Sequence, residues 1–321
     1  MRIVVLDDYQ DVARSFGPFD RLDASVEVRN EHIDDPDALV GALRGADVVV
    51  AMRERTPFGA PEFARLPDLR LLVTTGMANA SIDLTAAAAH GVTVCGTGGG
   101  GGGSRKSSAT AELTWALIFA LLRHVPEEDR ALRDGRWQTT VGTELGGLTL
   151  GVAGLGRLGS QVARIGQAFG MDVVAWSRHL TVDRAASVGV RAVSKDELLA
   201  ASDVLTVHLK LSDRTRGLFG AADLARMKPT SILVNTSRGP IVEEAALVAA
   251  LRAGALAGAG LDVYDREPLP ADSPLRGAPR TVLTPHLGYV TRQTYAAWFT
   301  EIVENIEAWA AGTPVRVLGR A

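Results

Sequence analysis

Three polar side chains stand just past apolar runs in the second half of the sequence. They are Arg238 in NTSRGP, Glu267 in LDVYDREP and His286 in LTPHLG. Arginine binds carboxylates through its two-pronged guanidinium and can polarise a neighbouring carbonyl, a task for which lysine lacks the geometry. Glutamate can hydrogen-bond an imidazole and favour its protonated form, and the imidazole can then exchange a proton with a substrate oxygen. Each residue alone fits a surface ion pair or a strand-end hydrogen bond, but together they are typical of acid-base chemistry.

A strand-helix-strand unit over residues 149–178 is the element that must position these side chains. It reads TLGVAGLGRLG, SQVARIGQAFG and MDVVAWSR, with Gly154, Gly156 and Gly159 between two apolar runs. In a dinucleotide-binding fingerprint the first glycine allows a tight turn, the second lets backbone approach a pyrophosphate, and the third lets helix pack on strand. N–H groups at the helix start then face the phosphates. The unit predicts a dinucleotide site, with the three polar side chains beside its nicotinamide end, where hydride moves.

The other apolar runs indicate two α/β domains. In residues 1–104, runs such as RIVVLDD, ADVVVA and LRLLVTT alternate with helical patterns, which predicts a parallel sheet covered on both faces. This segment has no GxGxxG of its own, so it forms a domain separate from the dinucleotide unit of residues 105–288. In residues 289–321, apolar side chains at helical spacing predict a long helix that returns to the first domain. The expected fold is therefore two doubly wound parallel-sheet domains, the first of them discontinuous.

A run of six glycines, Gly98–Gly103, precedes the dinucleotide unit. Because such a run loses much backbone entropy on ordering, it predicts a loop. Arg105 and Lys106 follow it and suggest a phosphate cradle, but the Walker pattern needs glycine directly before lysine, and Arg105 occupies that place. The composition favours a flexible connection.

Composition and charge exclude several classes of function. The chain has 321 residues, with 34 Lys and Arg against 37 Asp and Glu, so no global field attracts nucleic acid or an anionic membrane. No apolar run reaches membrane-spanning length, and the start, MRIVVLDDYQ, is a strand followed by acids rather than a leader. We therefore expect a cytoplasmic protein. There is neither HExxH nor a pair of cysteines, so no metal is expected.

Several longer motifs resemble the D-2-hydroxyacid dehydrogenase family, including its phosphoglycerate dehydrogenases and glyoxylate or hydroxypyruvate reductases. They are TTGMANASID, TAEL, GLGRLG, SDVLTVHLKL, NTSRGPIVEEAAL, GAGLDVYDREPLP and TPHLG, which span nearly the whole chain. The resemblance implies a flavodoxin-like substrate domain from both chain ends, a central Rossmann NAD(P)-binding domain, and a homodimer formed through the cofactor domains. The expected boundaries are 1–104 plus 289–321 and 105–288.

The resemblance also implies roles for single residues. Arg238 would bind substrate, His286 would act as acid and base, and Glu267 would support the histidine. Met77 and Ala78 would offer backbone N–H groups to the substrate carboxylate, and Arg53 matches a position that touches substrate in several members. The residues expected to line the cofactor, besides Gly154 and Gly156, are Thr110, Arg157, Leu158, Ser177, Arg178, Leu209, Thr236, Ser237, Asp262 and Gly288.

One departure from the family pattern concerns the choice of cofactor. The second strand of the dinucleotide unit usually ends in an acid that binds the adenosine ribose, but here Ser177 stands there, followed by Arg178. An acid would repel a 2′-phosphate, whereas an arginine accommodates it. We therefore expect NADP(H) to be preferred over NAD(H).

Other departures concern the substrate. Thr74 replaces a second basic residue that accompanies phosphorylated substrates, and Tyr289 stands after HLG where many members have a small residue. Small unphosphorylated 2-keto acids such as glyoxylate or hydroxypyruvate therefore fit better than a phosphoglycerate-type substrate. Oxidation of formate is a weaker alternative. A rival from another class is a dinucleotide-sensing corepressor on the same fold.

Overall fold

The computed structural model describes residues 1–98 and 107–319. Apart from Gly98, the expected glycine loop and the basic residues after it lie outside the described residues. The chain divides into two compact units, unit 1 with Met1–Lys106 and Thr291–Ala321 and unit 2 with Ser107–Val290. The second division, at 290/291, falls two residues later than the expected 288/289. Val290 N donates back to Leu287 O, which ties Val290 to unit 2. The side chain of Thr291 accepts from Thr294 N and caps the helix that follows in unit 1.

Unit 1 is built on a five-stranded sheet in the order β2-β1-β3-β4-β5. All pairs are parallel, and Ile3 stands opposite Val48 where the first and third strands meet. This is the order of flavodoxin-like sheets, in which the sequence of strands across the sheet reverses between β1 and β3 although all strands stay parallel. Val48, Val49 and Val50 are fully buried, as β-branched residues are in a sheet covered on both faces. The strands are β1 (Arg2–Val5), β2 (Ser25–Val28), β3 (Val48–Ala51), β4 (Leu71–Thr74) and β5 (Thr93–Gly96).

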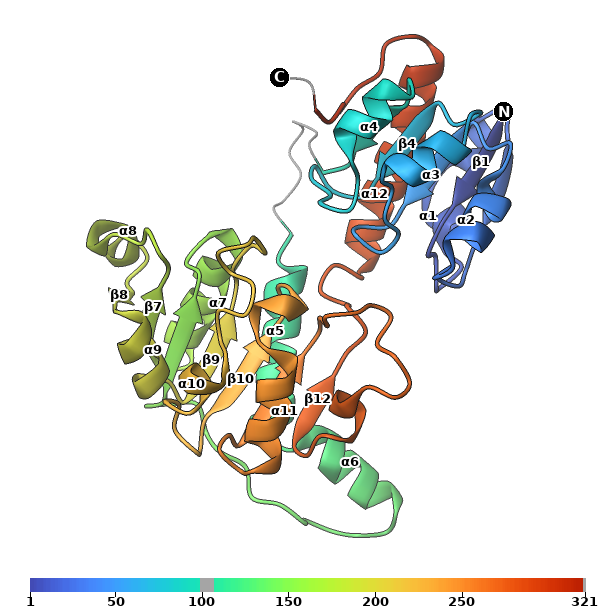
Figure 1. Ribbon diagram of the computed structural model, residues 1–321. Helices are drawn as coiled ribbons and strands as arrows, with labels where there is room; N and C mark the ends of the chain where they lie inside the picture. The colour runs from blue at the N-terminus through green and yellow to red at the C-terminus, as the bar shows by residue number, and fades with distance from the viewer. Residues whose placement is uncertain (99–106, 320–321) are drawn as a thin grey trace. The chain divides into compact units, whose positions relative to one another are not determined.

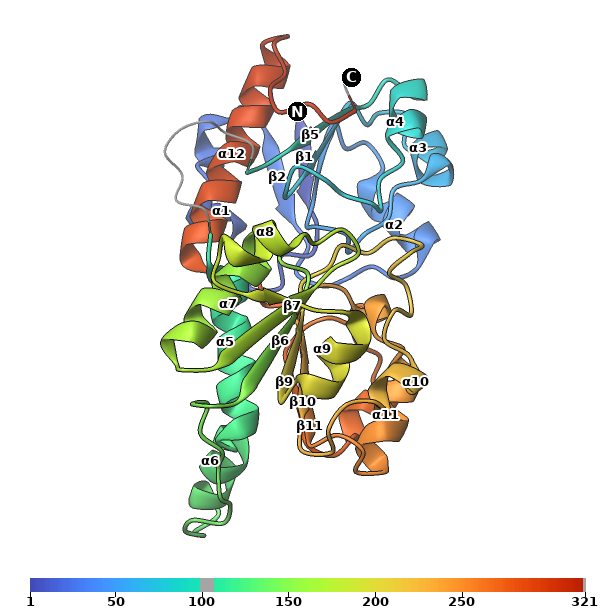
Figure 2. The ribbon, with the colours of Figure 1, turned by 90° about the vertical axis from the view of Figure 1, so that its left-hand side faces the viewer.

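Helices cover both faces of this sheet (Figure 2). One face carries α1 (Ala13–Phe16) and the long α12 (Arg292–Ala310), and the other carries α2 (Pro36–Leu43), α3 (Ala60–Arg65) and α4 (Leu84–Ala89). A short 3₁₀ turn, η1 (Phe19–Arg21), follows α1.

Helix α12 brings the far end of the chain into unit 1. Its residues Phe299, Ile302 and Ile306 are fully buried. Asn305 Nδ2 donates to Gly96 O over 2.8 Å and ties the helix to the end of β5. Trp298 is only half-buried, so it is not part of that apolar core.

Unit 2 contains a seven-stranded parallel sheet in the order β12-β11-β10-β9-β6-β7-β8. The order reverses between β6 and β9, which is where doubly wound sheets of this kind bind dinucleotides. The expectation of two doubly wound parallel-sheet domains is confirmed. The strands are β6 (Thr149–Ala153), β7 (Asp172–Trp176), β8 (Arg191–Ala192), β9 (Val204–Val207), β10 (Ile232–Asn235), β11 (Gly258–Leu261) and β12 (Thr281–Leu283).

The helices of unit 2 also lie on both faces of the sheet (Figure 1). Helices α5 (Ala109–Leu122), α7 (Arg157–Ala168) and α8 (Val182–Ala186) share one apolar core, and α9 (Lys195–Ala201), α10 (Ala221–Leu224) and α11 (Glu244–Arg252) share the other. Helix α5 lies close to β11. A Cβ on Gly260 would come within 3.0 Å of Leu117 Cβ, so glycine at this position permits the close packing. Two short 3₁₀ turns, η2 (Gly239–Ile241) and η3 (Pro274–Gly277), complete the unit.

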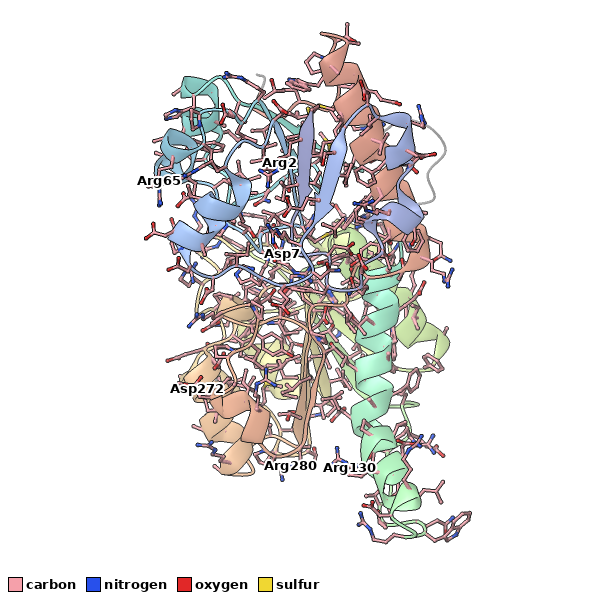
Figure 3. The ribbon with its side chains drawn as sticks, turned by 90° about the vertical axis from the view of Figure 1, so that its right-hand side faces the viewer. Arg2, Asp7, Arg65, Arg130, Asp272 and Arg280 are labelled. Atoms are coloured by element: carbon pink, nitrogen blue, oxygen red, sulfur yellow. The ribbon has the colours of Figure 1, made fainter. Side chains whose placement is uncertain are left out.

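The polar segment after α5 forms a further helix, α6 (Val125–Arg133). Its first turn has Glu127 and Glu128 and its last turn has Arg130 and Arg133, charges that suit the two ends of a helix. The helix extends beyond the sheet of unit 2, where Arg130 is labelled (Figure 3). No helix among residues 1–98 and 107–319 is long and apolar enough to cross a membrane.

Candidate active site

The first and third glycines of the fingerprint have no room for a side chain. Gly154 has a φ of +101°, and a Cβ there would lie 2.6 Å from His208 O at the end of β9. A Cβ on Gly159 would lie 2.0 Å from Gly154 O. These two residues therefore let β6, α7 and β9 meet closely at the point where the strand order reverses.

The middle glycine has a different environment. A Cβ on Gly156 would meet nothing within 4 Å, and the residue is exposed. It is the N-cap of α7 and supplies no side-chain cap, so the first N–H groups of the helix, at Arg157 and Leu158, are available to an anion. A dinucleotide pyrophosphate fits this open backbone. The Arg157 guanidinium donates to Ser107 O over 2.7 Å and lies along the start of α5.

His286 and Glu267 form a direct pair. His286 Nδ1 lies 2.5 Å from Glu267 Oε2. Because the ionised carboxylate only accepts, the pair places the Nδ1 proton on the imidazole and leaves Nε2 to exchange a proton with another molecule. Glu267 Oε1 accepts from Tyr264 N over 3.0 Å, so both oxygens of the glutamate are fixed.

The loop that carries His286 is held by Asp262. One carboxylate oxygen accepts from Leu287 N and from Thr284 Oγ1, each over 2.7 Å, and the other accepts from Gly288 N over 2.8 Å. His286 itself has a φ of +56°, a left-handed conformation that costs energy for a residue other than glycine. Burial raises the pKa of Asp262. A buried carboxylate thus holds the histidine in a strained turn.

The start of α5 meets the same loop. Thr110 Oγ1 donates to Gly288 O over 2.8 Å, and Thr114 Oγ1 lies 2.8 Å from Thr236 Oγ1. Of the residues expected to line the cofactor, Thr110, Thr236, Asp262 and Gly288 therefore lie in one hydrogen-bonded region at the carboxyl ends of β10, β11 and β12.

Arg238 follows β10 in a turn that Asn235 fixes. Asn235 Oδ1 accepts from Ser237 N over 3.0 Å, and its Nδ2 donates to Arg238 O over 2.9 Å. A Cβ on Gly239 would lie 2.1 Å from the carbonyl carbon of Tyr264, so this turn packs against the segment that leads to Glu267. Arg238 is half-buried, and its Nη1 donates to Ser237 O over 2.7 Å.

Ser177 and Arg178 lie directly beside the glycine loop. Gly154 N donates to Trp176 O, the last residue of β7, over 2.8 Å. The next residue, Ser177, is half-buried, and Arg178 is exposed and forms no ion pair with any described residue. Leu209 is half-buried after β9 and packs on the apolar core.

The expected substrate residues Arg53, Met77 and Ala78 all belong to unit 1. Arg53 follows β3 in a left-handed conformation, with a φ of +54°. Met77 and Ala78 follow β4 and are exposed. Within the described part of the chain, no hydrogen bond uses their N–H groups. The loop is therefore able to bind an anion through its backbone.

Two asparagines of the site were missing from the sequence predictions. Asn235 orients the turn of Arg238, and Asn79 donates through Nδ2 to Arg53 O over 2.5 Å and to Thr74 Oγ1 over 2.8 Å. The available signal was an asparagine at or soon after the end of a strand, where its side chain accepts from the backbone N–H two residues later. Thr74 is fully buried, so its side chain does not face solvent.

His208 also lies at this edge, just past β9. Both ring nitrogens are buried and have no hydrogen-bond partner among the described residues. Burial lowers the pKa of His208 to about 4. The ring is neutral at neutral pH. In the part of the chain that the structure covers, no group of three His, Cys, Asp or Glu side chains could hold a metal ion.

Comparison with known proteins agrees with this geometry. The family model described as D-isomer specific 2-hydroxyacid dehydrogenase, NAD binding domain, matches residues 115–288. A glyoxylate reductase from Aeropyrum pernix is 41% identical over 258 residues, which cover 78% of this chain and 76% of the reductase. A D-3-phosphoglycerate dehydrogenase from Archaeoglobus fulgidus is 38% identical over 83% of this chain, and the match covers 50% of its own length.

A solved structure is similar over nearly the full length. The phosphoglycerate oxidoreductase from Vibrio cholerae O395 has a TM-score of 0.91 and 38% identity, with 97% of this chain and 99% of that chain covered. The chain therefore spans about half the length of the phosphoglycerate dehydrogenase from Archaeoglobus fulgidus, but nearly all of the Vibrio cholerae protein.

Proposed function

The chain belongs to the D-isomer specific 2-hydroxyacid dehydrogenase family, and on this premise we propose that it reduces small unphosphorylated 2-keto acids. Glyoxylate and hydroxypyruvate are the proposed substrates, and the products are the 2-hydroxy acids, of D configuration where C2 is a stereocentre. The same residues serve the reverse reaction. The single observation that carries the proposal is the 2.5 Å contact between His286 and Glu267 at the carboxyl edge of a dinucleotide-binding sheet.

The acid-base step belongs to His286. A nicotinamide dinucleotide supplies the hydride when it is bound. As the substrate carbonyl becomes an alkoxide, His286 Nε2 donates a proton to its oxygen, and Glu267 stabilises the imidazolium before that transfer. Arg238 polarises the carbonyl and binds the adjacent carboxylate through its guanidinium. Asp262 and Asn235 orient the histidine and the arginine through the hydrogen bonds described above.

In unit 1, we assign the substrate carboxylate to the N–H groups of Met77 and Ala78. Their exposure and their unused hydrogen-bonding capacity support this role. Thr74 is buried and hydrogen-bonded to Asn79, so it offers no charge to a phosphate, which supports an unphosphorylated substrate.

A substrate panel tests the proposal. The loss of NADPH absorbance is followed with glyoxylate, hydroxypyruvate and 3-phosphohydroxypyruvate, and formate is tested in the oxidative direction. Turnover of the first two with a preference over the phosphorylated acid is expected. His286→Asn should lower kcat by about 10²- to 10⁴-fold, the usual contribution of a general acid, while His179→Asn at an exposed position should leave it unchanged.

Two results would contradict the assignment. Intact turnover by His286→Asn would remove the acid-base role. Tight cofactor binding without turnover of any keto acid would favour a dinucleotide-sensing corepressor.

For the cofactor, we propose NADP(H) over NAD(H). Arg178 is exposed and has no ion-pair partner among the described residues. It follows the end of β7, the position at which an arginine accommodates a 2′-phosphate, and Ser177 carries no repelling charge. The kcat/KM ratio of NADPH to NADH measures the preference. Arg178→Gln should lower that ratio by about tenfold, the value of one charged hydrogen bond, whereas Arg184→Gln on α8 serves as a control. A clear preference of the wild type for NADH would refute the proposal.

For the quaternary structure, we propose a homodimer formed through unit 2. Helix α6 and the segment after it carry unusually exposed apolar side chains, with Trp137 76% and Val141 91% exposed. Surfaces of this kind commonly bind another protein, and a second copy supplies the same surface. Light scattering should give the mass of two chains. The double variant Trp137→Ser, Val141→Ser should give one chain, and an unchanged mass would place the interface elsewhere.

A further inference from the structure

The guanidinium of Arg53 is held by groups from three parts of unit 1. Its Nη1 donates to Thr75 O over 3.2 Å, and its Nε lies 3.6 Å from Glu54 Oε2. Its Cζ lies 5.9 Å from the centroid of the Trp298 ring on α12. Cations within about 6 Å of an aromatic centroid are attracted to the ring face. An aromatic residue from the far end of the chain therefore faces this arginine.

The backbone of Arg53 is already fixed without the tryptophan. Its N–H donates to Thr75 Oγ1 over 2.9 Å, and its carbonyl accepts from Asn79 Nδ2 over 2.5 Å. What these bonds do not determine is the direction of the long side chain. Arginine side chains carry about 2 kcal/mol of rotamer entropy, and the contacts of the guanidinium with Thr75 O, Glu54 and the Trp298 ring together restrict it.

The guanidinium lies against the loop that we assign to the substrate carboxylate. A Cβ on Gly76 would lie 2.1 Å from Arg53 Nη1, so the guanidinium packs directly against the backbone of Gly76. The next two residues are the exposed Met77 and Ala78, whose N–H groups are used by no hydrogen bond among the described residues. An anion bound to this loop would meet the positive charge at close range.

Trp298 lies at the edge of the buried face of α12. On that face Phe299 and Ile302 are fully buried and Tyr295 is 4% exposed, whereas Trp298 is half-buried. One turn further, Glu301 accepts a hydrogen bond from Gly98 N. This edge of α12 therefore also meets the loop that follows β5.

We propose that Trp298 is a positioning residue that keeps the guanidinium of Arg53 over the anion-binding loop of Gly76–Ala78. The proposal rests on the proposed function, which gives that loop a 2-keto carboxylate to bind. The indole acts through Arg53 and does not take part in the proton or hydride transfer. Its loss weakens binding of the acid and leaves the rate of the bound complex unchanged.

A double-mutant cycle tests whether Trp298 acts through Arg53. The variants are Trp298→Leu, Arg53→Gln and the double substitution, with Trp298→Phe to retain a ring and Trp309→Leu as the matched control on the same helix. Calorimetry measures the binding of oxalate with and without NADPH. Oxalate is a planar dicarboxylate and serves as an analogue of a 2-keto acid. KM and kcat for glyoxylate are measured alongside.

Trp298→Leu is expected to weaken oxalate binding and raise KM by roughly 3- to 10-fold, the range of a partly desolvated cation–π contact, with kcat within about twofold of wild type. Trp298→Phe should recover most of the affinity, and Trp309→Leu should not change it. In the Arg53→Gln background, Trp298→Leu should have no further effect, because the charge on which it acts is gone.

Additive effects in the cycle, or a fall in kcat at constant KM, would overturn the proposal. A wild-type protein that turns over no keto acid, but whose oxalate affinity still depends on Trp298 only when Arg53 is present, would refute the proposed function and leave the positioning role intact.

Discussion

The two units reverse their strand order in the same way, but different kinds of residue lie at the two reversals. In unit 2 the reversal between β6 and β9 is lined by glycine backbone, and Gly156 is open to solvent. In unit 1 the carboxylate of Asp7 lies just past β1, at the reversal between β1 and β3, and the residue is 2% exposed (Figure 3). That carboxylate accepts from Thr56 Oγ1 over 2.7 Å and from the His32 ring over 2.9 Å.

The difference shows how one sheet architecture supports two kinds of binding. An open glycine loop at the helix start leaves N–H groups for phosphates. At the reversal of unit 1 hydrogen-bonded side chains stand instead, and the N–H groups of Met77 and Ala78, which no hydrogen bond among the described residues uses, lie after β4. The function of each unit therefore follows from the residues at its strand ends and not from its strand order.

The largest expected effect comes from adding one methyl group to a glycine of the fingerprint in unit 2. Gly159→Ala places a Cβ 2.0 Å from a backbone oxygen and should lower the free energy of unfolding by at least about 3 kcal/mol. Gly156→Ala meets no protein atom and should leave the unfolding temperature unchanged while weakening NADPH binding at least about tenfold. Thermal denaturation and fluorescence titration measure the two quantities. Equal destabilisation by both substitutions would contradict the distinction between the glycines.

A second test uses the neutral histidine of unit 2. Because burial lowers the pKa of His208 to about 4, the unfolded chain binds the proton first as the pH falls. Stability is then lost between pH of about 6.5 and 4, by up to about 3 kcal/mol. Urea denaturation at several pH values should show a weaker pH dependence for His208→Leu in this window. Parallel pH profiles for variant and wild type would exclude a buried neutral ring.

A third test compares two buried aspartates, one from each unit. Asp7→Asn and Asp262→Asn each replace an acceptor of several hydrogen bonds and should cost about 2 kcal/mol of stability. Only Asp262→Asn should lower kcat, by about 100-fold, because an amide cannot accept through two oxygens from both Leu287 N and Gly288 N, and His286 is then displaced. If Asp7→Asn lowered kcat equally, Asp7 would have a catalytic role.

The smallest expected effect concerns His32 and has the opposite pH dependence. The hydrogen bond to Asp7 raises the pKa of His32. The resulting stabilisation is fully present below the unfolded value of about 6.5 and is lost as the pH rises through the raised value. His32→Gln should therefore cost about 1 kcal/mol at pH 5.5 and less at pH 8.5. If His32→Gln cost more stability at pH 8.5 than at pH 5.5, the protonated form of His32 would not be the stabilising one.

The parts of the fold and site that the sequence predicts are those with local signals. The glycine spacing of residues 149–178 and the apolar runs before Arg238, Glu267 and His286 each lie within one short segment, and the two doubly wound sheets are confirmed. The sequence of helix α6 is mostly polar, and only its ends carry local signals: charges, Pro126 in the first turn and Gly135 after the last.

The remaining features depend on contacts between distant segments. The 2.5 Å pairing of His286 with Glu267 accompanies the left-handed turn that Asp262 holds, and the TPHLG motif does not indicate that its histidine takes a positive φ. Likewise the ring of Trp298 reaches Arg53 only after the chain has returned to unit 1. Periodicity predicts the helix but not the partner of each side chain.

The position of α12 sets the order in which a newly synthesised chain can finish folding. The strands of unit 1 leave the ribosome first, but Phe299, Ile302 and Ile306, which cover one face of their sheet, leave last. Unit 2, by contrast, is contiguous over Ser107–Val290 and can close as soon as it is made. During that interval one face of the valine-rich sheet of unit 1 lacks α12, and the exposed apolar surface makes the nascent chain prone to aggregate.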